Sequence, residues 1–203
     1  MISLHQEIEA KLEANPVDPA DFIKWVFSKP ITGAIKSYKF VTGPDHYFEN
    51  EAGYVVRHRD AQTEGLSELT TKRRKSDTTT RDRLEVDLQC VAGTNPNDVH
   101  AFFNALGFKA AFTLVKEAYI IYANITPNLE MSFVIYDVWR DDAPDTRRRF
   151  IEIEASKGST VTPETAKRHV NYQVKELREK FGLNEPLNDS LYELYSGKKY
   201  QKV

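Results

Sequence analysis

The stretch ISLHQEIEAKLE, residues 2–13, decides the first element of the fold. Its Glu, Ala, Lys and Leu content favours a helix. Its apolar residues, however, all occupy even positions from Ile2 to Leu12, and its charged residues all occupy odd positions. A period of two is typical of a β-strand with one apolar and one charged face. We therefore predict a strand over this stretch.

The rest of the chain alternates between strand-like segments and helix-start signals. Helices are expected to begin after Asp18, Asn95 and Thr162, because each is followed by a proline at the first helical position. A short helical tail is expected at residues 191–195. Further strands are expected at residues 35–48, 53–59, 67–74, 83–91, 108–124, 129–139 and 149–155. Because most strands follow strands, we predict an α+β fold with a largely antiparallel sheet, in a single domain of residues 1–203.

Two irregularities are expected within this pattern. The turn-forming residues Gly43, Pro44 and Asp45 are expected to break the second strand. The charged segment between Asp137 and Phe150 is expected to form a long loop.

Composition and charge exclude several classes of protein. The 203 residues carry 28 Lys and Arg against 30 Asp and Glu, a formal net charge of −2. This excludes a generally basic nucleic-acid coat but permits a local basic pocket. No apolar run approaches the roughly 20 residues of a membrane span, the first residues lack the layout of a secretory signal, and a single cysteine, Cys90, excludes an internal disulfide. We expect a cytoplasmic monomer or homodimer that binds neither membranes nor nucleic acid in bulk.

The charged faces of the strands follow a sign pattern along the chain. Ionisable residues two positions apart share a strand face, and acids gather on the first and last strands whereas bases gather on the middle ones. A solvated outer face is the ordinary position of such residues, but it gives no reason for the signs to segregate by strand. A closed or strongly curled sheet with a charged lumen gives that reason. The pairs are Glu7 and Glu9, Arg57 and Arg59, Lys72 and Arg74, Arg83 and Glu85, and Glu152 and Glu154.

Such a lumen would suit a complex of a metal ion with a polyphosphate. Carboxylates bind hard divalent cations through oxygen, and Lys and Arg bind phosphate, Arg in a bidentate manner. Together these groups stabilise the charge that develops in phosphoryl transfer. The sequence has no glycine-rich phosphate loop, and its five histidines have no metal-ligand spacing.

Short motifs along nearly the whole chain occur in the order of a known family. They are Glu7-Ile8-Glu9-Ala10-Lys11, Asp45-His46-Tyr47-Phe48, Val55-Val56-Arg57-His58-Arg59, Leu69-Thr70-Thr71-Lys72, Arg83-Leu84-Glu85, Val134-Ile135-Tyr136-Asp137, Phe150-Ile151-Glu152-Ile153-Glu154 and Ser190-Leu191-Tyr192-Glu193-Leu194. In this order they resemble the CYTH superfamily, the triphosphate tunnel metalloenzymes. The resemblance implies an eight-stranded antiparallel β tunnel or barrel with flanking helices.

The resemblance also implies an enzyme, a metal-dependent phosphohydrolase that acts on a triphosphate such as ATP, tripolyphosphate or thiamine triphosphate. It assigns one or two Mg²⁺ or Mn²⁺ ions to Glu7, Glu9, Glu85, Asp137, Glu152 and Glu154. It assigns the phosphates to Lys11, Arg57, Arg59, Lys72, Arg74, Arg83 and Lys116. Lys11, Glu9 and Glu154 are expected to be catalytic, with Lys11 orienting or deprotonating the attacking water.

Other functions remain open at this point. A class IV adenylate cyclase, which converts ATP to cyclic AMP and pyrophosphate, would use the same tunnel, and a protein that sequesters a nucleotide without turnover would too. One departure motivates the binding protein: the strand after the second helix keeps Lys116 but has Ala118 where the family often has arginine. The presence of every acid pair favours the hydrolase. A sheet protein with a merely solvated charged face is the fourth alternative.

Overall fold

The computed structural model describes the backbone of residues 2–29, 35–61, 66–74, 81–91, 94–155 and 161–199. The side chains of residues 2–7, 36, 61, 66, 72–74 and 81–85 lie outside this description. The strands are β1 (Ile2–Glu13), β2 (Ile35–Glu49), β3 (Val55–Ala61), β4 (Leu66–Arg74), β5 (Arg81–Gln89), β6 (Lys109–Thr126), β7 (Leu129–Arg140) and β8 (Ala143–Ala155). The helices are α1 (Pro19–Ser28), α2 (Pro96–Ala105), α3 (Pro163–Phe181) and α4 (Leu191–Ser196).

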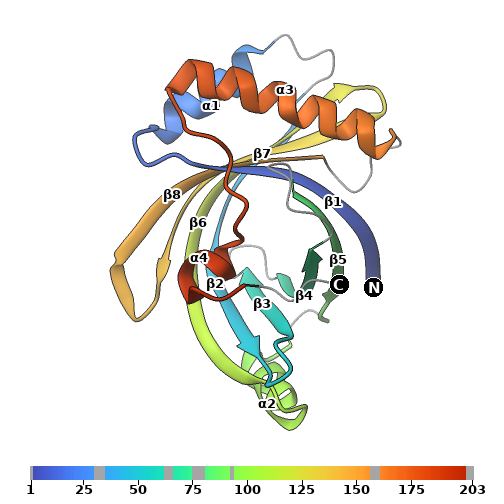
Figure 1. Cartoon of the computed structure of the whole chain (residues 1–203), viewed down its shortest axis with the longest axis vertical. Coiled ribbons are helices and arrows are strands. Elements are labelled where there is room, and N and C mark those ends of the chain that lie inside the picture. Colours follow the sequence, from blue (N-terminus) through green and yellow to red (C-terminus); the bar gives the residue numbers. More distant parts are fainter. Residues whose placement is uncertain are drawn as a thin grey trace.

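The eight strands form one closed antiparallel barrel, in the order β1-β5-β4-β3-β2-β6-β7-β8. Closure depends on β1, whose N-terminal part pairs with β5 and whose C-terminal part pairs with β8. Figure 1 looks into the lumen, with β2 and β6 on one side and β1 and β5 on the other. The predicted fold class is therefore confirmed.

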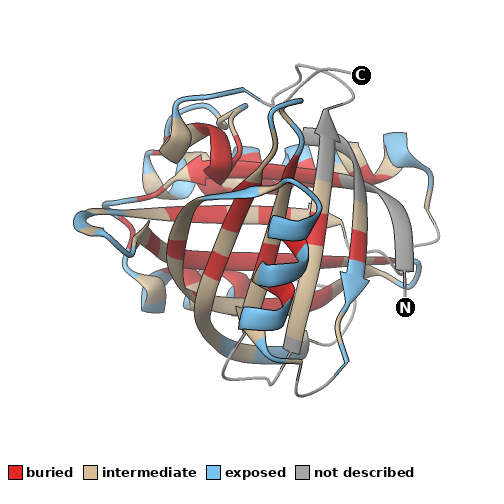
Figure 2. Ribbon diagram, turned by 90° about the horizontal axis from the view of Figure 1, so that it is seen from below, coloured by how far each residue is buried: buried red, intermediate tan, exposed pale blue. Residues whose placement is uncertain are grey.

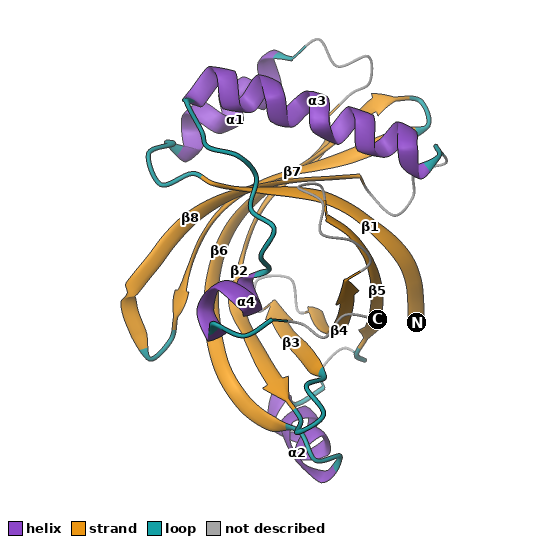
Figure 3. Ribbon diagram, in the orientation of Figure 1, coloured by secondary structure: helices purple, strands orange, loops and turns teal. Residues whose placement is uncertain are grey.

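Helices α1 and α3 cover one outer side of the barrel, over β1, β7 and β8 (Figures 1 and 3). Each starts as its sequence predicts: Asp18 and Thr162 cap the first turn through their side chains, and proline follows. The apolar face of β1 packs under this layer, which forms the largest core cluster of the protein. Figure 2 shows buried residues along the middle of the strands and exposed residues on the outer faces of the helices.

Helices α2 and α4 lie at two other places on the barrel. Helix α2 packs Val99 and Phe103 on Phe48, on the outer face of β2 and away from the α1–α3 layer. Helix α4 instead packs on residues that line the lumen: Leu191 and Tyr192 belong to the cluster that contains Tyr136 and Phe150 of β7 and β8. A capping box of Ser190 and Glu193 fixes the start of α4. Helix α4 therefore covers lumen-facing apolar side chains at one end of the barrel.

Both expected irregularities are absent, and both predictions were wrong. Strand β2 continues through Gly43, Pro44 and Asp45, which pair with β6 in unbroken register. In the described registers, the pairing of β2 with β3 starts only at Asp45, so Pro44 lies where one neighbour is present and a missing N–H is tolerated. Likewise β8 begins at Ala143, so most of the expected loop is a strand paired with β7.

No helix in the described part of the chain is long and apolar enough to cross a membrane.

Candidate active site

Each strand of the barrel alternates between an outer face and the lumen. On β1, Ile8, Ala10 and Leu12 pack in the helix-covered core, so Glu9 and Lys11 point to the lumen. Both side chains are buried, with relative exposures of 4% and 2%. The expected charged lumen is thus present at β1.

Glu152 on β8 is the meeting point of side chains from three other strands. The ammonium of Lys11 lies 2.7 Å from Oε1 of Glu152, its register partner on β8. The hydroxyl of Tyr136 donates a 2.9 Å hydrogen bond to the same oxygen. Lys116 Nζ lies 3.9 Å from Oε2 and 3.6 Å from the centre of the Tyr136 ring. Glu152 therefore fixes the positions of two lysines inside the barrel.

The pKa of Lys116 is lowered by its position in the lumen. Burial lowers its pKa to about 8, the nearby Glu152 carboxylate opposes this change, and Arg59 adds to it. The side chain is therefore cationic at neutral pH, and the nearby acids offset only part of the cost of burying its charge. A bound anion would offset more of that cost.

Asp45 of β2 and Arg59 of β3 form a bidentate ion pair on another part of the wall. Arg59 Nε donates to Oδ1 and an Nη donates to Oδ2 of Asp45, each at 2.7 Å. Burial alone would raise the pKa of Asp45, but the charges of Arg59 and Arg57 and the hydrogen bonds from Arg59 outweigh burial and lower it well below its usual range. Asp45 thus stays ionised and holds the plane of the Arg59 guanidinium.

Arg57 begins a chain of polar contacts across three strands. Its guanidinium donates to Thr70 Oγ1 on β4 at 2.9 Å and lies 3.6 Å from the carboxylate of Glu68. The Thr70 hydroxyl donates to Asp87 on β5 at 2.9 Å. Thr70 and Asp87 are buried. Arg57 is therefore oriented from the side of β4 and β5.

The strand order sets Glu154 of β8 opposite the two arginines of β3. In a closed ring of eight strands, strands four places apart face each other, so β8 faces β3 and β1 faces β2. Glu154 of β8 thus lies opposite β3, which carries Arg57 and Arg59, whereas its register partner Glu9 of β1 lies opposite β2, which carries Asp45. A cavity of about 40 Å³ inside the barrel is lined by Val41, Gly43, Arg59, Lys116, Ala118 and Ile120. The lumen therefore holds cationic side chains around an internal space, with Glu154 on the strand opposite that of Arg59.

Five of the site residues expected from the sequence have side chains outside the described residues: Glu7, Lys72, Arg74, Arg83 and Glu85. Their backbone registers are defined. Glu7 is opposite Arg83 across β1 and β5, Lys72 is opposite Glu85, and Arg74 is opposite Arg83 across β4 and β5. Their Cα positions thus fall in adjacent rows of one side of the barrel.

Asp137 is not part of this group, and its assignment to the metal is corrected. On β7 it alternates with the lumen-facing Tyr136, and its carboxylate lies on the outer face of the barrel. There it accepts two hydrogen bonds from Arg149, at 2.7 and 2.8 Å, and one of 2.8 Å from Arg147. Burial raises its pKa, but the hydrogen bonds from these arginines outweigh burial and lower it. Asp137 has a structural role at the β7–β8 hairpin.

Asp45 and Tyr136 belong to the site and were not among the expected site residues. The sequence predicts a turn at Asp45, and it predicts a metal ligand at Asp137, the neighbour of Tyr136. The alternation of β7 from its buried apolar positions would have placed Tyr136 inside. The ion pair of Asp45 with Arg59 can be predicted only from the register of β2 and β3, which the structure supplies.

Three histidines form a cluster outside the barrel, between β2, β3 and α2. His58 is fully buried; its Nδ1 lies 3.3 Å from His100 Nε2, and its Nε2 lies 2.8 Å from Ser67 Oγ. His46 Nδ1 lies 3.0 Å from Thr113 Oγ1, and its ring meets that of His100 edge-on at 4.7 Å. These histidines pack α2 on the barrel.

The described residues fit a divalent ion in one respect. Glu9 and Glu154 are hard oxygen donors in register, and Mg²⁺ is commonly held by one or two carboxylates together with substrate phosphates and water. Among the described side chains, no group of three or more His, Cys, Asp or Glu stands close enough to hold a metal ion. Among the described side chains, Glu9 and Glu154 therefore offer two carboxylates and not a complete set of metal ligands.

Solved structures of archaeal proteins share this fold. The PH1012 protein of Pyrococcus horikoshii OT3 aligns with a TM-score of 0.65 at 21% identity, over 93% of this chain and 98% of that one. A conserved hypothetical protein of Pyrococcus furiosus aligns with a TM-score of 0.64 at 19% identity, over 93% and 99% of the two chains. The PH1819 protein of Pyrococcus horikoshii OT3 aligns with a TM-score of 0.62 at 18% identity, over 95% and 99%. No protein-family model matches this chain, and no curated protein sequence matches it.

Proposed function

We propose that this chain is a metal-dependent triphosphatase of the CYTH type, which binds the triphosphate of a small molecule or nucleotide inside the barrel and hydrolyses it. The observation that carries the proposal is the pair Arg59 and Lys116. Both line one internal cavity; Arg59 is on β3, opposite β8, and Lys116 lies 3.9 Å from Glu152 of β8. Cations fixed around a partly enclosed space suit a polyanion, because less solvent screens the interaction there than at an open surface.

The basic residues would bind and orient the phosphates. Arg59 is pre-organised by Asp45, and Arg57 by Thr70, so neither would lose much side-chain freedom on binding. Lys11 and Lys116 are held by Glu152 and would contact phosphate oxygens from the other side. Lys72, Arg74 and Arg83 are proposed to complete the phosphate site from β4 and β5.

Glu9 and Glu154 would hold Mg²⁺ or Mn²⁺, with Glu7, Glu85 and Glu152 as further candidates. When bound, the ion supplies charge neutralisation of the phosphates and lowers the pKa of a bound water. Lys11, whose ammonium lies 2.7 Å from Glu152, is proposed to orient the water. The burial of Glu9 and Lys11 keeps bulk solvent from these groups.

One incubation experiment tests the reaction. The protein is mixed with tripolyphosphate, ATP or thiamine triphosphate, each with Mg²⁺ or Mn²⁺, and the products are separated by chromatography. Release of inorganic phosphate supports the proposal. Pyrophosphate with cyclic AMP would instead identify a cyclase, and recovery of intact ligand would identify a binding protein. Glu117→Gln, on the outer face of β6 beside Arg147, is the matched control and should behave as the wild type.

A further inference from the structure

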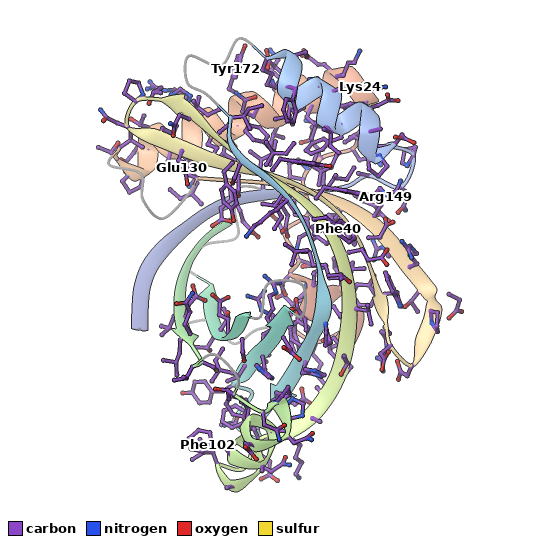
Figure 4. All side chains as sticks on the ribbon, turned by 180° about the vertical axis from the view of Figure 1, so that it is seen from behind. Lys24, Phe40, Phe102, Glu130, Arg149 and Tyr172 are labelled. Atoms are coloured by element: carbon purple, nitrogen blue, oxygen red, sulfur yellow. The ribbon has the colours of Figure 1, made fainter. Side chains whose placement is uncertain are left out.

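A second cavity lies outside the barrel, in the helix layer. It has a volume of about 410 Å³ and is lined by Lys29, Ile125, Arg168, His169, Tyr172, Gln173 and Glu176. Its size is in the range of small-molecule sites, about 300–1,000 Å³. Figure 4 shows Tyr172 in the helix layer, well away from the lumen. The cavity is thus separate from the proposed triphosphate site.

One face of α3 supplies most of the polar groups of this cavity. Residues 168, 169, 172, 173 and 176 fall at helical spacings that place them side by side. The remaining groups come from the C-terminal end of α1 and from the end of β6. The cavity therefore joins three elements that are far apart in the sequence.

Gln173 is the residue that indicates a ligand. The residue has a relative exposure of 6%, and it lines the cavity. Its Oε1 atom is buried and has no hydrogen-bond partner among the residues that the structure describes. A buried amide oxygen without a partner is costly, and native proteins rarely retain one. The oxygen is closed off from the cavity in this conformation, and a rotation of the Gln173 amide towards the cavity would bring it to a ligand that donates an N–H or O–H group, which would remove the cost.

The charges around the cavity select an anion. Lys29 pairs with Glu176, and its ammonium lies 3.9 Å from the centre of the Trp25 ring. Glu176 also accepts a 2.6 Å hydrogen bond from the Tyr172 hydroxyl, so its carboxylate is engaged on both sides. Arg168 adds a second cation, which leaves two cationic side chains against one acid. The lining is therefore net positive, with the ring of Tyr172 and the side chain of Ile125 as its apolar parts.

We propose that this cavity binds a small organic anion that donates a hydrogen bond to Gln173 and pairs its charge with Arg168. The ligand is of the size and chemistry of a nucleoside monophosphate: an anionic group, an apolar ring and N–H or O–H donors. The proposal does not depend on the reaction proposed for the lumen.

Trp25 provides a local reporter of occupancy. The chain has two tryptophans, Trp25 and Trp139, so Trp139→Phe leaves Trp25 as the only one. AMP is titrated into this variant, and the substitutions of Gln173 and Arg168 described below separate binding at this cavity from binding in the lumen. We expect a saturable change in Trp25 fluorescence with a dissociation constant of about 1 mM or tighter. Inorganic phosphate and adenosine are titrated separately, and each alone should bind at least about tenfold more weakly.

Two variants and a control decide the outcome. Gln173→Leu and Arg168→Ala should each weaken AMP binding by about tenfold or more, and Lys175→Ala, an exposed residue of α3, should not. Gln173→Leu should also raise the melting temperature of the free protein, because it removes the buried oxygen. Absence of a saturable signal with AMP would overturn the proposal, as would equal binding by Gln173→Leu. Equal affinity for inorganic phosphate and AMP would overturn the role of Gln173.

Discussion

Asp45 on β2 clamps the guanidinium of Arg59 on β3 through two hydrogen bonds of 2.7 Å. The two residues are register partners, so the pairing of the strands itself brings them together. Arg59 lines the internal cavity beside Lys116, and Asp45 is 1% exposed. The buried carboxylate of Asp45 thus fixes the orientation of a guanidinium that lines the internal cavity.

Removing the charge of Asp45 should destabilise the protein. Asp45→Asn leaves Arg59 with one neutral acceptor in a largely buried site, and we expect the free energy of unfolding to fall by about 2–4 kcal/mol. Urea unfolding at pH 7 measures this loss. Asp142→Asn, which removes an exposed partner of Arg140, is the control and should leave the unfolding midpoint nearly unchanged. Equal effects of the two substitutions would contradict a special role for Asp45.

The contribution of Asp45 should vanish in acid. The pKa of Asp45 is lower in the folded than in the unfolded protein, so the unfolded state binds a proton first as pH falls. The stability that Asp45 provides is therefore complete above its unfolded pKa of about 4 and declines below it. The difference in unfolding free energy between wild type and Asp45→Asn should be constant from pH 7 to 5 and shrink at pH 3. A difference that grows on acidification would contradict this sign.

Lys116 should oppose stability while favouring phosphate binding. Burial lowers its pKa to about 8, below the pKa of a lysine in the unfolded chain. At a pH where Lys116 is protonated, its buried charge therefore lowers the free energy of unfolding. Stability should therefore rise with pH between about 8 and 10. Lys116→Met should increase the unfolding free energy at pH 7 by up to about 3 kcal/mol and weaken tripolyphosphate binding. A loss of both stability and affinity would mark Lys116 as a structural partner of Glu152.

The same titration should appear in ligand binding. Wild-type affinity for tripolyphosphate should fall as pH rises through about 8, because Lys116 loses its charge. Lys116→Arg keeps a charge throughout this range and should remove that fall. Calorimetric titrations from pH 7 to 9 in Ca²⁺ compare the two proteins.

Glu154→Gln or Glu9→Gln should abolish metal-dependent phosphate release with little loss of stability. Each substitution removes an oxygen ligand from the register pair, and removing one carboxylate relieves repulsion between like charges. The melting temperature in metal-free buffer should stay level or rise. A large drop would show that these acids stabilise the fold through neighbouring bases instead.

Ala118→Arg tests the departure from the family pattern. Ala118 is buried and lines the internal cavity beside Lys116, as its alternation on β6 predicted. The cavity of about 40 Å³ is small for the added side chain, and a further cation would stand near Lys116 and Arg59. We expect a lower melting temperature for the free variant and a larger increase on adding tripolyphosphate than in wild type. An unchanged response to tripolyphosphate would show that position 118 does not contact the phosphates.

The histidine cluster under α2 should make the protein sensitive to acid. Burial, then the proximity of His100 and His46, lowers the pKa of His58 to about 4, so the unfolded state takes up this proton first. Stability should therefore fall as pH drops from about 6.5 to 4, by up to about 3 kcal/mol for this group. His58→Gln should flatten that decline, and His169→Gln on α3 should not. An identical pH dependence of His58→Gln and wild type would assign the acid sensitivity to other groups.

The strand-like patterns of the sequence predicted the eight strands, because burial on one side of a strand leaves a two-residue repeat, and they placed Glu9 and Lys11 on the inner face. The capping residues and prolines at Asp18, Asn95 and Thr162 likewise predicted the helix starts, since these signals are local. The two errors, at Gly43–Asp45 and at the start of β8, also came from local signals. There, pairing with a neighbouring strand overrides the turn preference of the residues.

The tertiary structure decided which residues meet. The sequence placed Glu9, Lys11, Arg57, Arg59, Lys116, Glu152 and Glu154 on charged strand faces. Only strand order and register determine that Lys11 and Lys116 share Glu152, that Asp45 holds Arg59, and that Asp137 lies outside. Contacts between strands remote in sequence depend on how the barrel closes, and no local pattern encodes that closure. The cavity at Gln173 has the same origin, because it forms only where the ends of α1 and β6 meet the face of α3.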